Sequence, residues 1–422
     1  MRKLSLTLLL SASAIAAPAA AQEIKFKPIV DARLRYETVE QNGPAPLSRD
    51  RDADAVTLRL RMGGELSKGP FAVLGEAEGT LAIDEDYNSG VNGRSAYPIV
   101  ADPQNVELNR LQVQYRTKPL VVTIGRQRIN LDDQRFVGSV AWRQNEQTFD
   151  AARIEYMGIK NLKVDLTYAI AARTIWGIDG GKFGATGRPA RLDGDNVFAN
   201  VSYKFKPGTL TGFAYIVDED EPVLALQRNS SLTYGARFAG GLPLSRKIKI
   251  SYLLSYARQS DHGRNPVRYE ADYAAAEGNV EAYGFKLTGG YELLGSDAGA
   301  TGIVGGYAFQ TPFATLHKFN GWADKFLTTP ATGIQDYYAG IGYTVPKVGS
   351  TGPLVAGFTF HRFDSDRNAI HYGDEYNAQV SLKISKHLTA LVKYADYERN
   401  GIASYAGDAD TKKFWAQIDY AL

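Results

Sequence analysis

The feature that most constrains this 422-residue chain is an alternation of polar and apolar side chains with a period of two residues. One example covers residues 30–37, which read Val30, Asp31, Ala32, Arg33, Leu34, Arg35, Tyr36 and Glu37. Successive side chains of a β-strand point to opposite faces, so the pattern predicts strands with one apolar and one polar face. Helical membrane spans are not expected, because no run of about 18 apolar residues follows residue 22.

We expect 18 such strands, with boundaries accurate to about two to four residues. They cover residues 28–39, 55–66, 70–83, 105–116, 119–128, 148–157, 161–173, 195–206, 208–217, 230–241, 246–258, 279–292, 297–309, 335–345, 353–363, 373–385, 387–397 and 411–422.

The connections between these strands alternate between short and long. Short turns such as 67–69 and 206–207 are followed by long polar connections such as 84–104, 259–278 and 310–334. A soluble β-sandwich also has strands with one apolar face, but its architecture does not require short and long connections to alternate. In an outer-membrane barrel they alternate, because short turns lie on one side of the membrane and long loops on the other. The last segment can pair with the first and leave no open edge. We therefore predict an all-β fold: a single transmembrane antiparallel β-barrel of about 18 strands, with short periplasmic turns and long extracellular loops, in the outer membrane of a Gram-negative bacterium.

The first residues have the pattern of a secretory signal peptide. Arg2 and Lys3 precede the apolar stretch 4–17, and three alanines stand before Gln22. We expect residues 1–21 to be removed and residues 22–422 to form the barrel. The chain has 48 basic and 46 acidic residues, so without Arg2 and Lys3 the two balance. Bulk charge therefore gives no argument for a polyanionic partner, and no nucleic-acid partner is expected.

Composition removes several classes of function. The chain has no cysteine and five histidines, so we expect no metal and no cofactor. The acidic runs 84–86 and 218–221 lack the spacing of a calcium loop and are interpreted as solvated loops. Ser260, Asp261 and His262 supply the residue types of a hydrolase triad, but immediate neighbours rarely face one another as a triad. No nucleophile elbow is present, so we do not expect an enzyme.

The polar register of the first strands is rich in arginine. On the predicted inner face lie Arg33, Arg35, Arg59, Arg61, Arg110, Arg116, Arg126 and Arg153, and Arg128, Arg135 and Arg143 follow in the loop after the fifth strand. Carboxylates share this region. Two interpretations compete: a row of guanidinium groups that passes anions from site to site, or ion pairs between strands that hold the shape of the barrel.

The most specific segment runs from Gly125 to Ala151. Its motif comprises Gly125-Arg126-Gln127-Arg128, an acid and arginine at Asp133 and Arg135, the pair Trp142-Arg143, and Phe149-Asp150-Ala151. Its loop is rich in charged and aromatic residues and is a candidate to fold into the lumen as a constriction. The motif resembles the alginate export family of outer-membrane β-barrels, whose 18-stranded barrel also fits the expected strand count.

This resemblance implies a passive channel for anionic solutes, above all an acidic polysaccharide such as alginate, with an arginine-lined constriction. It bears on Arg126, Arg128, Asp133, Arg135, Trp142, Arg143 and Asp150. Together with Arg33, Arg35, Arg59, Arg61, Arg110 and Arg153, these form the expected solute path. The expected partners are outer-membrane lipid and lipopolysaccharide, the anionic saccharide, and periplasmic export components. The alternatives are a general porin for small anions or saccharides, a surface receptor, and a barrel-embedded enzyme.

Overall fold

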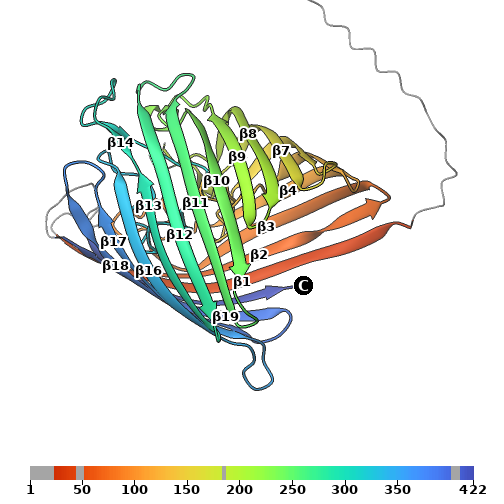
Figure 1. Ribbon diagram of the computed structural model, residues 1–422. Coiled ribbons are helices and arrows are strands. Elements are labelled where there is room, and N and C mark those ends of the chain that lie inside the picture. The colour runs from red at the N-terminus through yellow and green to blue at the C-terminus, as the bar shows by residue number, and fades with distance from the viewer. Residues whose placement is uncertain (1–22, 44–51, 183–186, 401–408) are drawn as a thin grey trace, which may run out of the picture.

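A computed structural model describes residues 23–43, 52–182, 187–400 and 409–422 (Figure 1). The expected signal peptide lies outside these residues. The strands of the main sheet are β1 (Lys25–Asn42), β2 (Asp52–Lys68), β3 (Phe71–Asp86), β4 (Asn105–Arg116), β5 (Leu120–Gln127), β6 (Thr148–Tyr156), β7 (Leu162–Arg173), β8 (Arg191–Phe205), β9 (Gly208–Val217), β10 (Ser231–Pro243), β11 (Ile248–Asp261), β12 (Glu270–Ala282), β13 (Phe285–Leu294), β16 (Ile334–Val345), β17 (Leu354–Asp364), β18 (His371–Lys383), β19 (Leu388–Arg399) and β20 (Asp410–Ala421).

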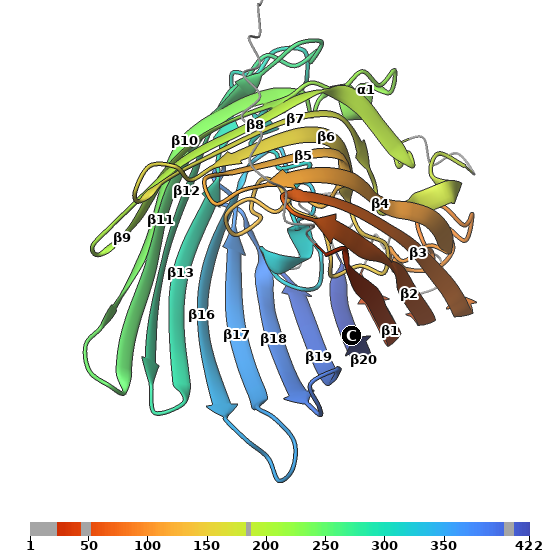
Figure 2. The same cartoon turned by 90° about the vertical axis from the view of Figure 1, so that its right-hand side faces the viewer.

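Within the described residues these strands form one 18-stranded antiparallel sheet that closes on itself (Figures 1 and 2). Each strand pairs with its neighbours in the sequence, and β1 pairs with both β2 and β20. Closure places Arg33 opposite Asp419 on one side and opposite Arg59 on the other. The predicted fold class is confirmed: the closed sheet has no free edge whose backbone groups would need another partner.

The two faces of the barrel wall differ as the alternation predicts. Leu58, Leu60 and Met62 on β2 are exposed on the outside, whereas the intervening Arg59 and Arg61 are buried inside. In an ordinary soluble protein such apolar exposure would be unfavourable, but lipid chains cover this face in a membrane barrel. The apolar register is therefore the lipid-facing one, and the charged register faces the lumen.

Two of the predicted strands are wrong, although their number is right. The predicted strand 279–292 runs across a tight turn at Tyr283 and Gly284, which have positive φ and join β12 to β13. The predicted strand 297–309 lies in a long connection that holds only the two-residue strands β14 (Ser296–Asp297) and β15 (Tyr307–Ala308). The predicted loop 259–278 is correspondingly shorter, because β12 already begins at Glu270. The apolar register changes at the turn, from Val280 and Ala282 to Tyr283, Phe285 and Leu287, and the predicted strand 279–292 ran across this break.

Helical structure is limited to short turns. The described residues contain η1 (Gly177–Asp179), α1 (Leu224–Gln227) and η2 (Leu316–Lys318). In the part of the chain that the structure covers, no helix has both the length and the apolar character needed to span a bilayer. The turn η2 lies inside the barrel: it belongs to the teal segment between the walls in Figure 2.

Candidate functional site: the narrowed lumen

The connection between β5 and β6 enters the barrel, as its composition predicts. Ile129, Leu131 and Val137 of this first inward segment (residues 128–147) are buried. Its Arg135 reaches β13, where Nε donates to Glu292 at 2.7 Å, and its Arg143 faces Glu37 of β1 at 3.4 Å. One loop therefore contacts walls on different sides of the barrel and narrows the lumen.

A second connection, between β15 and β16, enters the lumen beside the first. Residues 309–333, the second inward segment, were predicted to be an external loop, and this is corrected here. The backbone N–H of Gly138 donates to the carbonyl of Phe313 at 2.8 Å, and Val137 forms a parallel bridge with Phe313. The hydroxyl of Thr315 bonds the Gln134 side chain at 2.7 Å. The two segments thus form one body inside the barrel.

Trp142 joins this body to the barrel wall. Its carbonyl accepts hydrogen bonds from Arg33 Nη1 at 2.9 Å and from Arg35 Nη2 at 2.6 Å. The Arg35 guanidinium lies 4.1 Å from the centre of the indole ring, and His317 stacks on the same indole at 4.6 Å. Cation–π and stacking contacts between buried groups are each favourable by about 0.5–2 kcal/mol. Trp142 is therefore held by β1 and by the second inward segment together.

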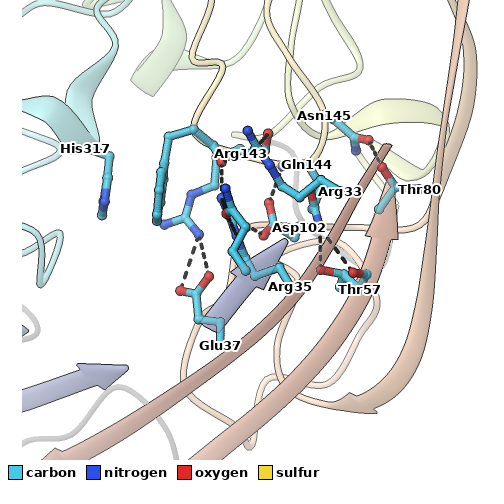
Figure 3. A network of polar contacts seen from close by, with 12 residues as sticks. Arg33, Arg35, Glu37, Thr57, Thr80, Asp102, Arg143, Gln144, Asn145 and His317 are labelled. Carbon is cyan, nitrogen blue, oxygen red and sulfur yellow. Dashed lines mark hydrogen bonds and ion pairs between the residues drawn. The ribbon is translucent and has the colours of Figure 1, made fainter. Parts of the chain in front are cut away.

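Arg143 is paired with two carboxylates, Glu37, which Figure 3 shows, and Asp324. Its Nη2 lies 2.7 Å from Asp324, and Asp324 also accepts from Lys413 of β20 at 2.8 Å and faces His317 Nδ1 at 2.7 Å. Burial alone would lower the pKa of Arg143, but Glu37 and Asp324 outweigh it and raise that pKa. Burial would likewise raise the pKa of Asp324, yet Lys413, His317 and Arg143 hold it well below its usual range. Arg143 and Asp324 therefore remain charged and hold the inward body to the wall electrostatically.

Each of the ten arginines of the expected solute path has a carboxylate partner. The pairs are Arg33–Asp419, Arg35–Asp102, Arg59–Asp31, Arg61–Glu78, Arg110–Glu76, Arg126–Asp150, Arg128–Glu146, Arg135–Glu292, Arg143–Glu37 and Arg153–Asp165. The ion-pair interpretation therefore applies to every one of them. Asp133, the remaining predicted acid of the inward segment, pairs with Arg237 of β10 at 3.2 Å.

Hydrogen bonding is incomplete for two neighbouring arginines on the inner wall of β2. Arg33 and Arg59 lie directly opposite each other on β1 and β2, and Arg61 follows on the same face. Buried Nε and Nη1 atoms of Arg59 and the Nη2 atom of Arg61 have no hydrogen-bond partner. Directly opposed like charges are unfavourable, and unsatisfied buried donors are costly. Three buried guanidinium nitrogens of the Arg33–Arg59–Arg61 group are therefore without a hydrogen-bond partner among the described residues.

Two predicted path residues do not face the lumen. The register pairs Arg126 with Leu111, whose side chain is exposed on the outer face, and with Asp150 of β6. The neighbouring Gln127 and Phe149 are the buried, inward residues. Arg126 and Asp150 therefore lie on the outer wall, which corrects the expectation for both. The sequence contains this signal, because Arg126 continues the apolar register of Val122 and Ile124.

Several residues of the site were not predicted. Asp102 and Glu146 supply buried carboxylates, and His317, Asp324 and Lys393 form a contact between the second inward segment and the wall. Residues 317–326 are as rich in charged and aromatic side chains as the first inward segment. This composition could have indicated that the second segment also enters the lumen. The hydrolase triad is not assembled: Asp261 pairs with Arg268, and His262 faces Asp218 at 3.9 Å. The described residues contain no group of three or more His, Asp or Glu side chains placed to hold a metal ion.

Comparisons with known proteins agree with this architecture. A sequence model described as alginate export matches residues 29–171, from β1 to β7. No curated protein matches the sequence. Among solved structures, OccAB2 of Acinetobacter baumannii is 16% identical with a TM-score of 0.66, and OpdQ of Pseudomonas aeruginosa is 14% identical with a TM-score of 0.61. OpdK of Pseudomonas aeruginosa with vanillate is 12% identical with a TM-score of 0.63. Each match covers 94% of this chain and 98% of the other.

The closed sheet, its lipid-facing apolar surface and these matches define an outer-membrane β-barrel of the porin type, in the class of channels for solutes. Such channels are not enzymes. The resemblance to the alginate export family is confirmed over residues 29–171, a region that holds most of the arginine register and the whole first inward segment.

Proposed function

We propose that this protein is a passive outer-membrane channel for anionic solutes, with acidic saccharides such as alginate and its oligomers as the preferred class. The observation that carries the proposal is the Arg33–Arg59–Arg61 group on the inner wall, in which Arg33 and Arg59 are directly opposed and three buried donors have no hydrogen-bond partner. A uronate carboxylate matches the planar fork of a guanidinium. The family match over residues 29–171 supports a carboxylated saccharide over other anions.

The ion pairs of the wall set the mechanism. Because every path arginine already has a carboxylate partner, a permeating anion meets oriented guanidinium groups but no large excess of positive charge. Such a site binds a carboxylate weakly enough to release it, which conduction requires. If a polymer is the natural solute, delivery by periplasmic export components would precede its passage.

The experiment is a reversal-potential measurement on the purified protein in a planar bilayer under a salt gradient, repeated with uronic-acid oligomers. We expect an anion-selective pore that these oligomers block. The double variant Arg59→Gln/Arg61→Gln should lose most of the selectivity and the block. Arg258→Gln, which removes a charge from the outer wall, is the matched control and should change neither. A native pore that is unselective or cation-selective would refute the proposal.

A second candidate is a channel for small organic carboxylates. The inward body fills part of the lumen with aromatic side chains, since Phe136 packs against Phe213, Tyr273 and Phe309. A narrowed, aromatic passage favours small solutes, and one structurally similar protein, OpdK, was solved with vanillate. Block by vanillate or a single uronic acid, without block by longer uronate oligomers, would favour this candidate over the saccharide channel.

A further inference from the structure

Three arginines lie together on the outer wall of the barrel, at the end of the strands where the long loops begin. On β8, Leu192 is buried inside, so Arg191 and Asp193 on either side of it face outward. Arg191 is directly opposite Arg173 of β7. The Arg173 Nε lies 3.8 Å from Asp150, the partner of Arg126. We call Arg126, Arg173 and Arg191 the outer arginine cluster.

Among the described residues the three guanidinium groups of the cluster form ion pairs with only two carboxylates, Asp150 and Asp193. Glu107 of β4 also acts on Arg126 and Arg173, but from beyond ion-pair distance. Arg126 donates two hydrogen bonds to Asp150, of 2.7 and 3.2 Å, and Arg191 forms an ion pair with Asp193 at 2.6 Å. Arg173 lies 3.8 Å from Asp150, which already accepts the hydrogen bonds of Arg126. The buried Nε atoms of Arg173 and Arg191 donate no hydrogen bond. Asp195, the next outward acid on β8, accepts from the Tyr168 hydroxyl. Donor capacity therefore remains where Arg173 and Arg191 face each other.

Three other outward cations on the described strands are matched by acids. Arg258 of β11 lies against both Glu270 and Asp272, Arg362 of β17 lies against Asp364, and Lys412 lies 4.0 Å from Asp396. These cations are balanced within the protein. The outer arginine cluster differs because two of its members are directly opposed like charges, an arrangement that an added anion would relieve.

The position of the cluster indicates the kind of anion. On the same strands but nearer the middle of the barrel, Ile124, Ile154 and Ile170 are exposed by 60%, 44% and 51%. The arginines thus lie where the apolar belt gives way to the loops. This is the level of lipid headgroups, and guanidinium groups match phosphate oxygens.

We propose that the outer arginine cluster binds the phosphate group of an anionic glycolipid in the outer leaflet, with the acyl chains of that lipid against Ile124, Ile154 and Ile170. The three guanidinium groups surround the phosphate, and Asp150 and Asp193 hold Arg126 and Arg191 in position. This site is separate from the lumen, so it does not depend on the solute that the channel carries.

Native mass spectrometry of the detergent-solubilised protein tests the proposal. The probes are lipid A with both phosphates, dephosphorylated lipid A with the same acyl chains, and inorganic phosphate. We expect the native protein to retain bisphosphorylated lipid A at least about tenfold better than the dephosphorylated form, a preference typical of one strong charge-assisted contact. Equal retention of the two lipids overturns the proposal. Inorganic phosphate that binds as tightly as lipid A also overturns it, in favour of a free-phosphate site.

The double variant Arg173→Gln/Arg191→Gln should lose this preference, whereas the control Arg258→Gln/Arg362→Gln should keep it. Heat-modifiable migration on gels and unchanged single-channel conductance establish that both variants are folded. If the glutamine pair does not fold, Arg173→Lys/Arg191→Lys keeps the charge without the planar fork and should reduce the preference part of the way. A folded variant of either pair that retains lipid A as the native protein does would refute the assignment.

Discussion

The ammonium group of Lys393 lies 2.7 Å from Nε2 of His317, inside the barrel. Lys393 belongs to the wall strand β19, and His317 belongs to the second inward segment. Trp142 and Trp322 lie around the same ammonium, with ring centres 4.2 and 3.7 Å from Nζ. An ammonium can only donate, so Nε2 of His317 accepts, and Nδ1 then carries the proton that His317 donates to Asp324. The contact therefore requires a neutral histidine.

Replacing Lys393 should loosen the inward body. In Lys393→Met, Nε2 of His317 is left buried without a donor, and the cation–π contacts with the tryptophans are lost. Such changes cost about 1–3 kcal/mol each. We expect a higher and noisier single-channel conductance than in the native protein, with the barrel still folded. Lys412→Met, on the outer wall, is the control, and an identical conductance in both variants would contradict this assignment.

The same contact predicts a dependence on pH. Burial and the Lys393 charge hold the pKa of His317 well below its ordinary value of 6.5, whereas a displaced segment would restore that value. The second inward segment therefore binds fewer protons in its place inside the barrel than when it is displaced. The free energy that favours its place inside the barrel is fully present above pH 6.5. It falls by about 1.4 kcal/mol per pH unit below pH 6.5, until the lowered pKa is reached. Asp324 and Arg143 also face this site and keep their charge over this range, and Lys413 forms an ion pair with Asp324.

Conductance should accordingly rise as the pH is lowered from 7.5 to 5. His317→Gln keeps a hydrogen-bonding side chain but cannot titrate, so its conductance should change little over that range. His387→Gln removes an exposed histidine at the short-turn end of the barrel, where its ring contacts the Ala421 carbonyl, and should respond as the native protein does. A full pH response in His317→Gln would assign the effect to other groups.

The sequence predicted the barrel but only part of the lumen, for a physical reason. Alternation reports which face of a strand is lipid-facing, so β1 and β2 and their two faces were predicted from the sequence. It does not report which acids pair with them, because Arg33 and Asp419 meet only when the first strand closes against the last. The direction of a long loop is equally non-local. The second inward segment enters the lumen through contacts of Gly138 and Gln134 with Phe313 and Thr315, far away in the sequence.

Arg135 should be the most costly arginine to remove. It is buried, and it donates to Glu292 at 2.7 Å, Thr311 at 3.0 Å and Asn320 at 3.1 Å. Arg135→Met leaves the Glu292 carboxylate buried and unpaired, which costs about 3–5 kcal/mol. Denaturant unfolding followed by tryptophan fluorescence measures the loss. Arg135→Met/Glu292→Gln removes both charges and should recover a large part of it, so a double variant as unstable as the single one would contradict the pairing.

Gly125 on β5 should tolerate no side chain, whereas Gly212 on β9 should tolerate a methyl group. Its φ is +116°, and a Cβ atom built there would lie 2.3 Å from the Leu111 carbonyl oxygen on β4. The backbone conformation alone costs about 1–3 kcal/mol for a non-glycine residue, and the overlap forces β4 and β5 apart. Gly125→Ala should therefore lower the yield of heat-modifiable barrel on refolding into detergent and displace Arg126 and the start of the first inward segment. Gly212→Ala on β9 is the matched control, because a Cβ there meets no atom within 4 Å. Equal refolding yields for the two alanine variants would show that the bend at Gly125 is not required for β5 to pair with β4.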